Sequence, residues 1–304
     1  MTTPARKHSV SRKRGLPVLR SHRKALRRRG RRSFRYWQHL TRCYAFFHRR
    51  TTAPARSLFR SLRRAFGAAV LALWLPALAR AETFTVTTSS DMTDPADGVV
   101  TLREAITLAN ASAGPDIINF AEALSGETIV LTQGELAISD DLSIDASNLT
   151  QAPVIDADQQ SRVMHFTAAE GDLVLTKLTL RNGRVSSRDA RGGGILFAST
   201  GAVTLTNSTL SGNSACSGAR GGPGSGGGSG GGISTVSGAV TLINSTLSGN
   251  SASSDHSFAY GGAIDTYSGA VTLTNSTLSG NSADGKSADG LFIFGGGGGI
   301  STVS

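Results

Sequence analysis

Cysteine, tryptophan and proline are scarce in this chain of 304 residues. The two cysteines, Cys43 and Cys216, stand far apart, which excludes a framework of several disulfides and a paired-cysteine metal site. No apolar run approaches the roughly 18 residues that a helix needs to cross a bilayer. Glycine is abundant instead, with 34 of the 37 glycines after position 81. That part of the chain is therefore either disordered or a repetitive fold rich in turns.

Acidic side chains are absent from residues 1–81, which hold 22 of the 31 lysines and arginines. Residues 82–304 hold the other 9 basic residues and all 21 acidic ones, a net charge of −12. The formal charge of +10 for the whole chain therefore describes neither part.

Residues 62–81 have the pattern of a secretory signal peptide. Two arginines precede an apolar run over residues 65–75, and small residues follow it. We expect cleavage between Ala81 and Glu82, and therefore an exported protein at the cell surface, in the outer membrane or outside the cell. The basic residues 1–61 are then a disordered extension or lie upstream of the true start, and no nucleic-acid partner is expected.

The strongest signal in the sequence is an internal repeat. The sequence GAVTLTNSTLSGNSA at residues 201–215 recurs at residues 269–283 and, with one change, at residues 238–252. A glycine box ending in isoleucine precedes each copy, and a fourth box ends at Ile300. Since the box and its next residues recur there without the rest of the unit, we expect the repeat to continue after Ser304. Constant units joined by variable segments are typical of a solenoid.

Apolar and polar residues alternate within each copy with the period of a strand, so Val203 and Leu205 point inward. Short strands between Gly and Asn corners cannot bury a face alone, but they can when stacked at about 4.8 Å per rung. The sequence therefore predicts an all-β, right-handed parallel β-helix over residues 191–304. Two ladders of asparagines are expected at its corners, the first with left-handed backbone angles: Asn207, Asn244 and Asn275, and then Asn213, Asn250 and Asn281.

Less regular rungs are expected over residues 122–190, including one long strand over residues 173–180. Apolar residues at helical spacing predict a single amphipathic helix over residues 101–111. A short helix there would cover the open end of the stack, as solenoids require.

The segment TLREAI at residues 101–106, followed by DIINF at residues 116–120, resembles the CSLREA domain. The resemblance covers residues 82–121 and implies the N-terminal cap of an exported bacterial β-helix protein. Val100 and Thr101 stand where that family has Cys and Ser.

The repeats over residues 191–304 resemble those of polymorphic outer membrane proteins. The GGAI box at residues 261–264 matches that family's first signature, and LSGN at residues 210–213 carries Leu where its second signature has Phe. The resemblance implies a surface-exposed or secreted passenger and assigns no catalytic residues.

A catalytic interpretation depends on one cluster of charged residues. Glycan-cleaving enzymes need paired acids, or acids that hold Ca²⁺ beside a basic residue. The best candidates here are Asp145, Asp156, Asp158 and Arg162. The aspartates suit turns at the ends of strands better than an active site, so no catalytic residue is expected. No histidine has ligand partners at a suitable spacing, so no metal or cofactor is expected.

Three functions fit these observations. The favoured one is a non-enzymatic, adhesin-like or structural surface protein that contacts cell-surface or matrix glycans or proteins, with an outer-membrane association supplied by a region after Ser304. The second is a secreted polysaccharide lyase or hydrolase that uses the charged cluster. The third is an ice- or surface-binding ladder of Thr204, Thr241 and Thr272, beside which Ile243 interrupts a second threonine ladder.

Overall fold

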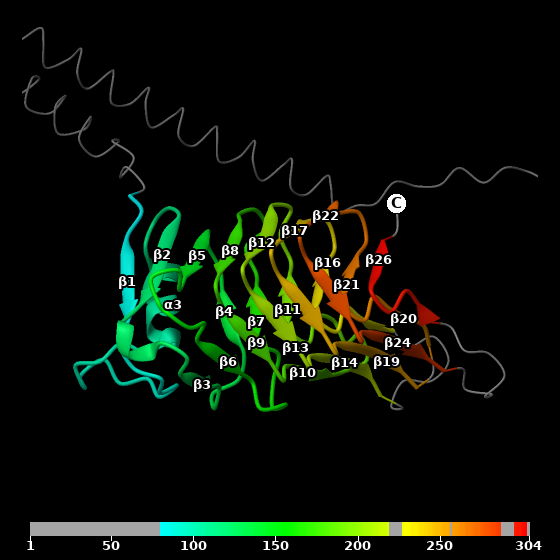
Figure 1. Ribbon diagram of the computed structural model, residues 1–304, viewed down its shortest axis with the longest axis horizontal. Helices are drawn as coiled ribbons and strands as arrows, with labels where there is room; N and C mark the ends of the chain where they lie inside the picture. Colours follow the sequence, from blue (N-terminus) through cyan, green and yellow to red (C-terminus); the bar gives the residue numbers. More distant parts are fainter. Residues whose placement is uncertain (1–79, 219–226, 256, 287–294, 303–304) are drawn as a thin grey trace, which may run out of the picture. The chain divides into compact units, whose positions relative to one another are not determined.

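The computed structural model describes residues 80–218, 227–255, 257–286 and 295–302, and these form a parallel β-helix (Figure 1). The predicted basic extension, residues 1–61, and nearly all of the predicted signal peptide, residues 62–81, lie outside them. Strands pair in parallel with their counterparts in the neighbouring rungs, which confirms the predicted all-β fold.

Two long sheets run along the stack. Sheet A contains seven strands in this order: β1 (Thr83–Val86), β2 (Asp116–Phe120), β5 (Leu142–Asp145), β8 (Leu173–Thr176), β12 (Ala202–Thr206), β17 (Ala239–Ile243) and β22 (Val271–Thr274). Sheet B contains six: β3 (Thr128–Val130), β6 (Val154–Asp156), β9 (Thr179–Arg181), β13 (Thr209–Ser211), β18 (Thr246–Ser248) and β23 (Thr277–Ser279).

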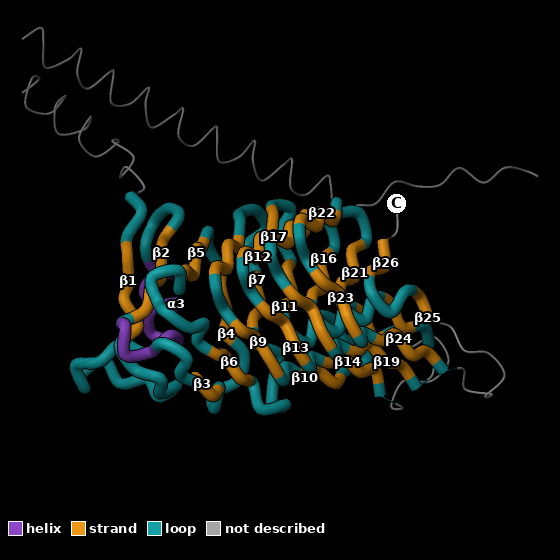
Figure 2. The backbone as a smooth tube through the Cα atoms, viewed as in Figure 1, coloured by secondary structure: helices purple, strands orange, loops and turns teal. Residues whose placement is uncertain are grey.

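Three further sheets complete the rungs. Sheet C contains β4 (Leu136–Ile138), β7 (Met164–Phe166), β11 (Ile195–Phe197), β16 (Ile233–Thr235), β21 (Ile264–Thr266) and β26 (Ile300–Thr302). Sheet D contains β10 (Arg184–Ser186), β14 (Ser214–Ser217), β19 (Ser251–Ser254) and β24 (Ser282–Gly285). Sheet E contains β15 (Gly228–Ser229), β20 (Ala259–Tyr260) and β25 (Gly295–Gly296). Sheet D begins with β10 and sheet E with β15, so the later rungs contain more strands than the first rungs (Figure 2).

Apolar side chains stack in register inside the rungs and form one continuous core. In sheet C, Ile195 pairs with Ile233, which pairs with Ile264. The glycine boxes let neighbouring strands approach at this corner. Gly192 has a φ of 59°, and a Cβ atom on Gly193 would lie 2.4 Å from the carbonyl oxygen of Ser214.

Helix α3 (Leu102–Ala111) lies with β1 at one end of the stack, where the sequence predicts a helix (Figure 1). Its four apolar residues at helical spacing are buried, and Thr101 and Glu104 form a capping box at its N-terminus. A short 3₁₀ helix, η1 (Glu122–Leu124), follows β2.

The prediction of a single strand over residues 173–180 is wrong. Lys177 has a φ of 56°, and the chain turns there from β8 into β9. Lys177 occupies the corner at which Asn207 stands one rung later, with a φ of 51°. The sequence pattern did not predict this turn because lysine, unlike asparagine or glycine, has no marked preference for left-handed backbone angles.

Candidate functional site

Asp156 lies at the end of β6, and its carboxylate is held by three neighbours. Oδ2 accepts a hydrogen bond from Arg181 Nε at 2.7 Å, and Oδ1 accepts one from the backbone N–H of Asp158 at 2.9 Å. Asn182 Nδ2 donates to both oxygens, at 3.0 and 3.2 Å. The parallel register supplies this arrangement, because Asp156 pairs directly with Arg181.

These contacts fix the charge state of Asp156. Burial acts to raise the pKa of its carboxyl group, but the hydrogen bonds from Asp158, Arg181 and Asn182 outweigh burial and lower it. An ionised carboxylate with a lowered pKa suits a structural anion better than a general acid, which must carry a proton.

Of the other predicted site residues, Asp145 lies on a different sheet, and Asp158 and Arg162 lie between β6 and β7 (Met164–Phe166). Asp145 ends β5 in sheet A, and its Oδ1 accepts the backbone N–H of Ser147 at 2.8 Å, which is an Asx turn. Asp158 is exposed and has a φ of 46°. Among the described residues, no hydrogen bond or ion pair joins Arg162 to any of the three aspartates.

Arg162 belongs instead to a cluster with Glu135 and His165. Its Nη1 pairs with Glu135 Oε2, while its Nε donates to the carbonyl oxygen of Gly192 at 2.8 Å. The other carboxylate oxygen of Glu135 lies 3.0 Å from His165 Nδ1. Sequence reasoning missed Glu135, because the parallel register brings it to these residues from 27 and 30 positions away.

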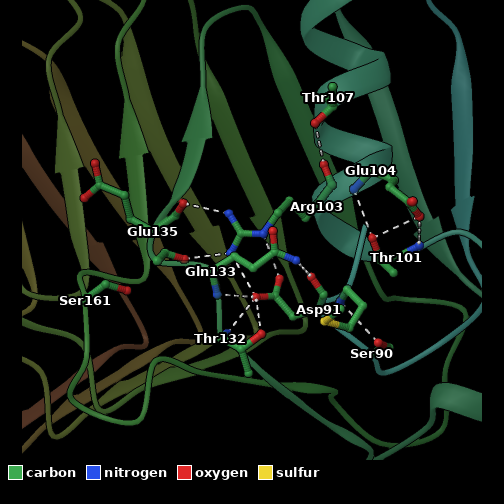
Figure 3. Close-up of polar contacts among 12 residues, drawn as sticks. Ser90, Asp91, Thr101, Arg103, Glu104, Thr107, Thr132, Gln133, Glu135 and Ser161 are labelled. Atoms are coloured by element: carbon green, nitrogen blue, oxygen red, sulfur yellow. Dashed lines mark hydrogen bonds and ion pairs between the residues drawn. The ribbon is translucent and has the colours of Figure 1, made fainter. Parts of the chain in front are cut away.

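A second charged network joins the cap to the first rungs (Figure 3). Asp91, which is only 5% exposed, accepts two hydrogen bonds from Arg103 of α3, at 2.9 and 3.1 Å. It also accepts the backbone N–H groups of Thr132 and Gln133, at 2.6 and 2.9 Å. Arg103 Nη1 donates to the carbonyl oxygen of Glu135 at 3.0 Å.

The TLREAI segment therefore has a structural role at most of its positions. Thr101 and Glu104 cap the helix, Arg103 ties it to Asp91, and the apolar residues fill the core. The contacts that these residues make with other described residues therefore stabilise the cap.

Asp265 stands on the outer side of sheet C, and its environment differs from that of Asp156. Burial raises the pKa of its carboxyl group, against the lowering effects of hydrogen bonds from Ser229 and Ser301 and of the charge of Arg191.

The six corner asparagines occupy two different settings. Asn207, Asn244 and Asn275 have φ values of 51°, 50° and 50°, and their residues are exposed. Asn213 and Asn250 are fully buried and form a ladder with Asn281. Asn213 donates from its backbone and from Nδ2 to Asn250 Oδ1, at 3.1 and 2.9 Å, and Asn250 repeats both bonds to Asn281.

A serine ladder, which the sequence reasoning did not predict, runs beside the exposed asparagines. Ser208 accepts the backbone N–H of Leu178 at 3.2 Å, Ser245 accepts that of Ser208 at 3.1 Å, and Ser276 accepts that of Ser245 at 3.2 Å. The recurring NST triplet could have predicted this ladder, because its asparagine lies at the corner and its serine points inward.

Threonine hydroxyl groups recur on the outer face of sheet A in the regular repeats. Thr204, Thr241 and Thr272 are register neighbours on sheet A. On sheet D a pocket of about 340 Å³ is lined by residues that include Gln159, Arg184, Ser214, Cys216 and Ser253. Arg184 is exposed and forms no ion pair with another described residue.

Comparison of the chain with known protein families, curated proteins and solved structures gives no match. Within the part of the chain that the structure describes, no group of three His, Cys, Asp or Glu side chains could hold a metal ion. No helix of that part is long and apolar enough to span a membrane.

Proposed function

We propose that this chain is an exported, non-enzymatic β-helix that attaches to glycan- or protein-covered surfaces through its outer faces. One observation carries the proposal: the copies of the repeat unit are nearly identical, whereas the residues and segments just beyond each copy vary. Along sheet D, Ala215, Ala252 and Ala283 stack inside. The register neighbours one position later, on the outer face of sheet D, are Ser186, Cys216, Ser253 and Asp284. Constant rungs that carry variable residues and segments beside them suit a scaffold that presents a surface.

The chemistry of that surface suits hydroxyl-rich or anionic partners. The sheet D pocket combines hydroxyl groups with the amide of Gln159 and the guanidinium of Arg184, which can bind hydroxyl and carboxylate groups. The resemblance of residues 82–121 and 191–304 to exported passengers supports the same proposal. So does the signal-peptide pattern at residues 62–81.

Attachment of the exported protein to cells and to immobilised glycans tests this function. Arg184→Gln should reduce attachment several-fold, whereas Arg188→Gln, which changes an exposed arginine outside the pocket, should leave it unchanged. Unchanged attachment by both variants would show that the pocket does not contribute to attachment. Absence of attachment by the unmodified protein would contradict the proposed function itself.

A polysaccharide-cleaving activity is the second candidate, and the Glu135–His165 contact favours it. A carboxylate that holds Nδ1 of a histidine leaves Nε2 for proton transfer, and Nε2 of His165 has no hydrogen bond to a described residue. This activity predicts new reducing or unsaturated ends from a polysaccharide panel, lost in His165→Gln. A panel without products would exclude it for those substrates.

A further inference from the structure

Asp116, the first residue of β2, is a carboxylate buried in the cap with only 1% exposure. Its Oδ1 accepts the backbone N–H of Glu82 at 2.8 Å and lies 3.4 Å from Ser112 Oγ. Its Oδ2 is also buried and has no hydrogen-bond partner. Among the described residues, no ion pair involves Asp116. A buried carboxylate oxygen without a donor is costly, so this atom requires an explanation.

Glu82 is the residue that follows the predicted cleavage site of the signal peptide. In the uncut chain its nitrogen belongs to a peptide bond and offers one N–H, which Oδ1 of Asp116 accepts. Hydrolysis of the Ala81–Glu82 bond by a signal peptidase adds the hydroxyl of water to the Ala81 carbonyl carbon and a proton to the Glu82 nitrogen. With a second proton from solvent, this nitrogen becomes an α-ammonium group with three N–H donors and a positive charge.

We propose that this α-ammonium group forms a buried ion pair with Asp116, so that removal of the signal peptide completes the cap. The nitrogen is already in place: the carbonyl oxygen of Glu82 accepts the N–H of Ile117 at 2.8 Å, and Thr83 pairs with Ile117 in sheet A. An ammonium group has three donors and a positive charge where the peptide nitrogen has one N–H, so it can offer Oδ2 of Asp116 the donor that this atom lacks. The inference rests on the proposed export for its cleavage step.

Cleavage of the full chain in vitro tests the ion pair. A specific protease site is placed immediately before Glu82, and the melting temperature is measured before and after the cut. A second version carries the site before Ala81, so that the new terminus lies one residue too early. The cut at Glu82 should raise the melting temperature by about 2–4 °C, and the cut at Ala81 should not.

Two controls remove the charge pair without moving the terminus. Asp116→Asn and acetylation of the new α-amino group should each abolish the gain from the cut at Glu82. The acetylated protein keeps the test valid where Asp116→Asn fails to fold. An equal gain from both cuts, or a gain that survives acetylation, would overturn the inference.

N-terminal sequencing of the protein exported by its host tests the processing step. Glu82 as the first residue supports the inference, and any other first residue overturns it. The attachment assay is independent of this result. A protein that starts at Glu82 but does not attach contradicts only the proposed function, and one that attaches but starts elsewhere contradicts only the ion pair.

Discussion

At the scale of single residues, Asp156 and Asp265 show how neighbours decide the behaviour of one side chain. Burial acts to raise the pKa of both carboxyl groups. Donors from Asp158, Arg181 and Asn182 reverse the effect at Asp156, whereas the bonds from Ser229 and Ser301 do not reverse it at Asp265. Asp156 therefore stabilises the fold as an anion. The pKa of Asp265 is raised, so this carboxyl group holds its proton more tightly than usual.

The Asp156→Asn substitution tests the structural role of this anion. A lowered pKa in the folded state means that Asp156 contributes stability above the unfolded value of 3.8, and that this contribution is lost as the pH falls through the folded pKa. The variant should lose about 1–2 kcal/mol of unfolding free energy at pH 7, because the partly exposed Arg181 moderates the effect. Its stability should also depend less on pH below 4 in denaturant titrations. A variant as stable as the unmodified protein at pH 7 would contradict this role.

At the scale of elements, Arg103 connects α3 to the first rungs. Arg103→Ala should destabilise the protein by about 2 kcal/mol, because it leaves Asp91 buried with backbone donors but without its charged partner. Hydrogen exchange should accelerate most in the amides of α3. Thr107→Ala is the matched control, since Thr107 is exposed on the same helix and bonds only to the Arg103 carbonyl among the described residues. Equal effects of both substitutions would contradict the role of Arg103.

Sequence periodicity predicts those elements whose residues carry their own signal. Alternation located the strands of the repeats, and apolar spacing located α3. The corner at Lys177 carried no such signal. The contact between Glu135 and Arg162 also could not be predicted, because it depends on a rung register that residues 122–190 do not repeat visibly. The candidate acids were found by residue type, but the placement of Asp145 and Asp156 on two different sheets emerged only from the three-dimensional fold.

At the scale of the whole molecule, the buried asparagine ladder links rung to rung. Asn250→Ala should cost about 3 kcal/mol or more, because it removes the acceptor of two bonds from Asn213 and the donor to the Leu210 carbonyl. Asn244→Gly changes an exposed corner with left-handed backbone angles, which glycine adopts readily, and should alter stability by less than about 0.5 kcal/mol. Chemical denaturation of the two variants measures the difference. A cost at Asn244 equal to that at Asn250 would contradict the ladder.

The continuous core makes the rungs depend on one another. Leu242 is fully buried between Leu205 and Leu273 in sheet A, so Leu242→Asp places an unpaired charge in the core. The middle rungs should unfold, with loss of strand signal in circular dichroism and of protease resistance. Thr241→Asp, one residue away on the outer face, should preserve both. Retention of both signals in Leu242→Asp would show that the inward assignment is wrong.

The central claim is that the molecule presents a surface for attachment without transforming what it binds. The most direct measurement follows the exported protein on a panel of immobilised polysaccharides, recording bound protein and released products in the same wells. We predict retained binding without new reducing or unsaturated ends. Release of products that stops in His165→Gln would contradict the claim and favour the enzyme.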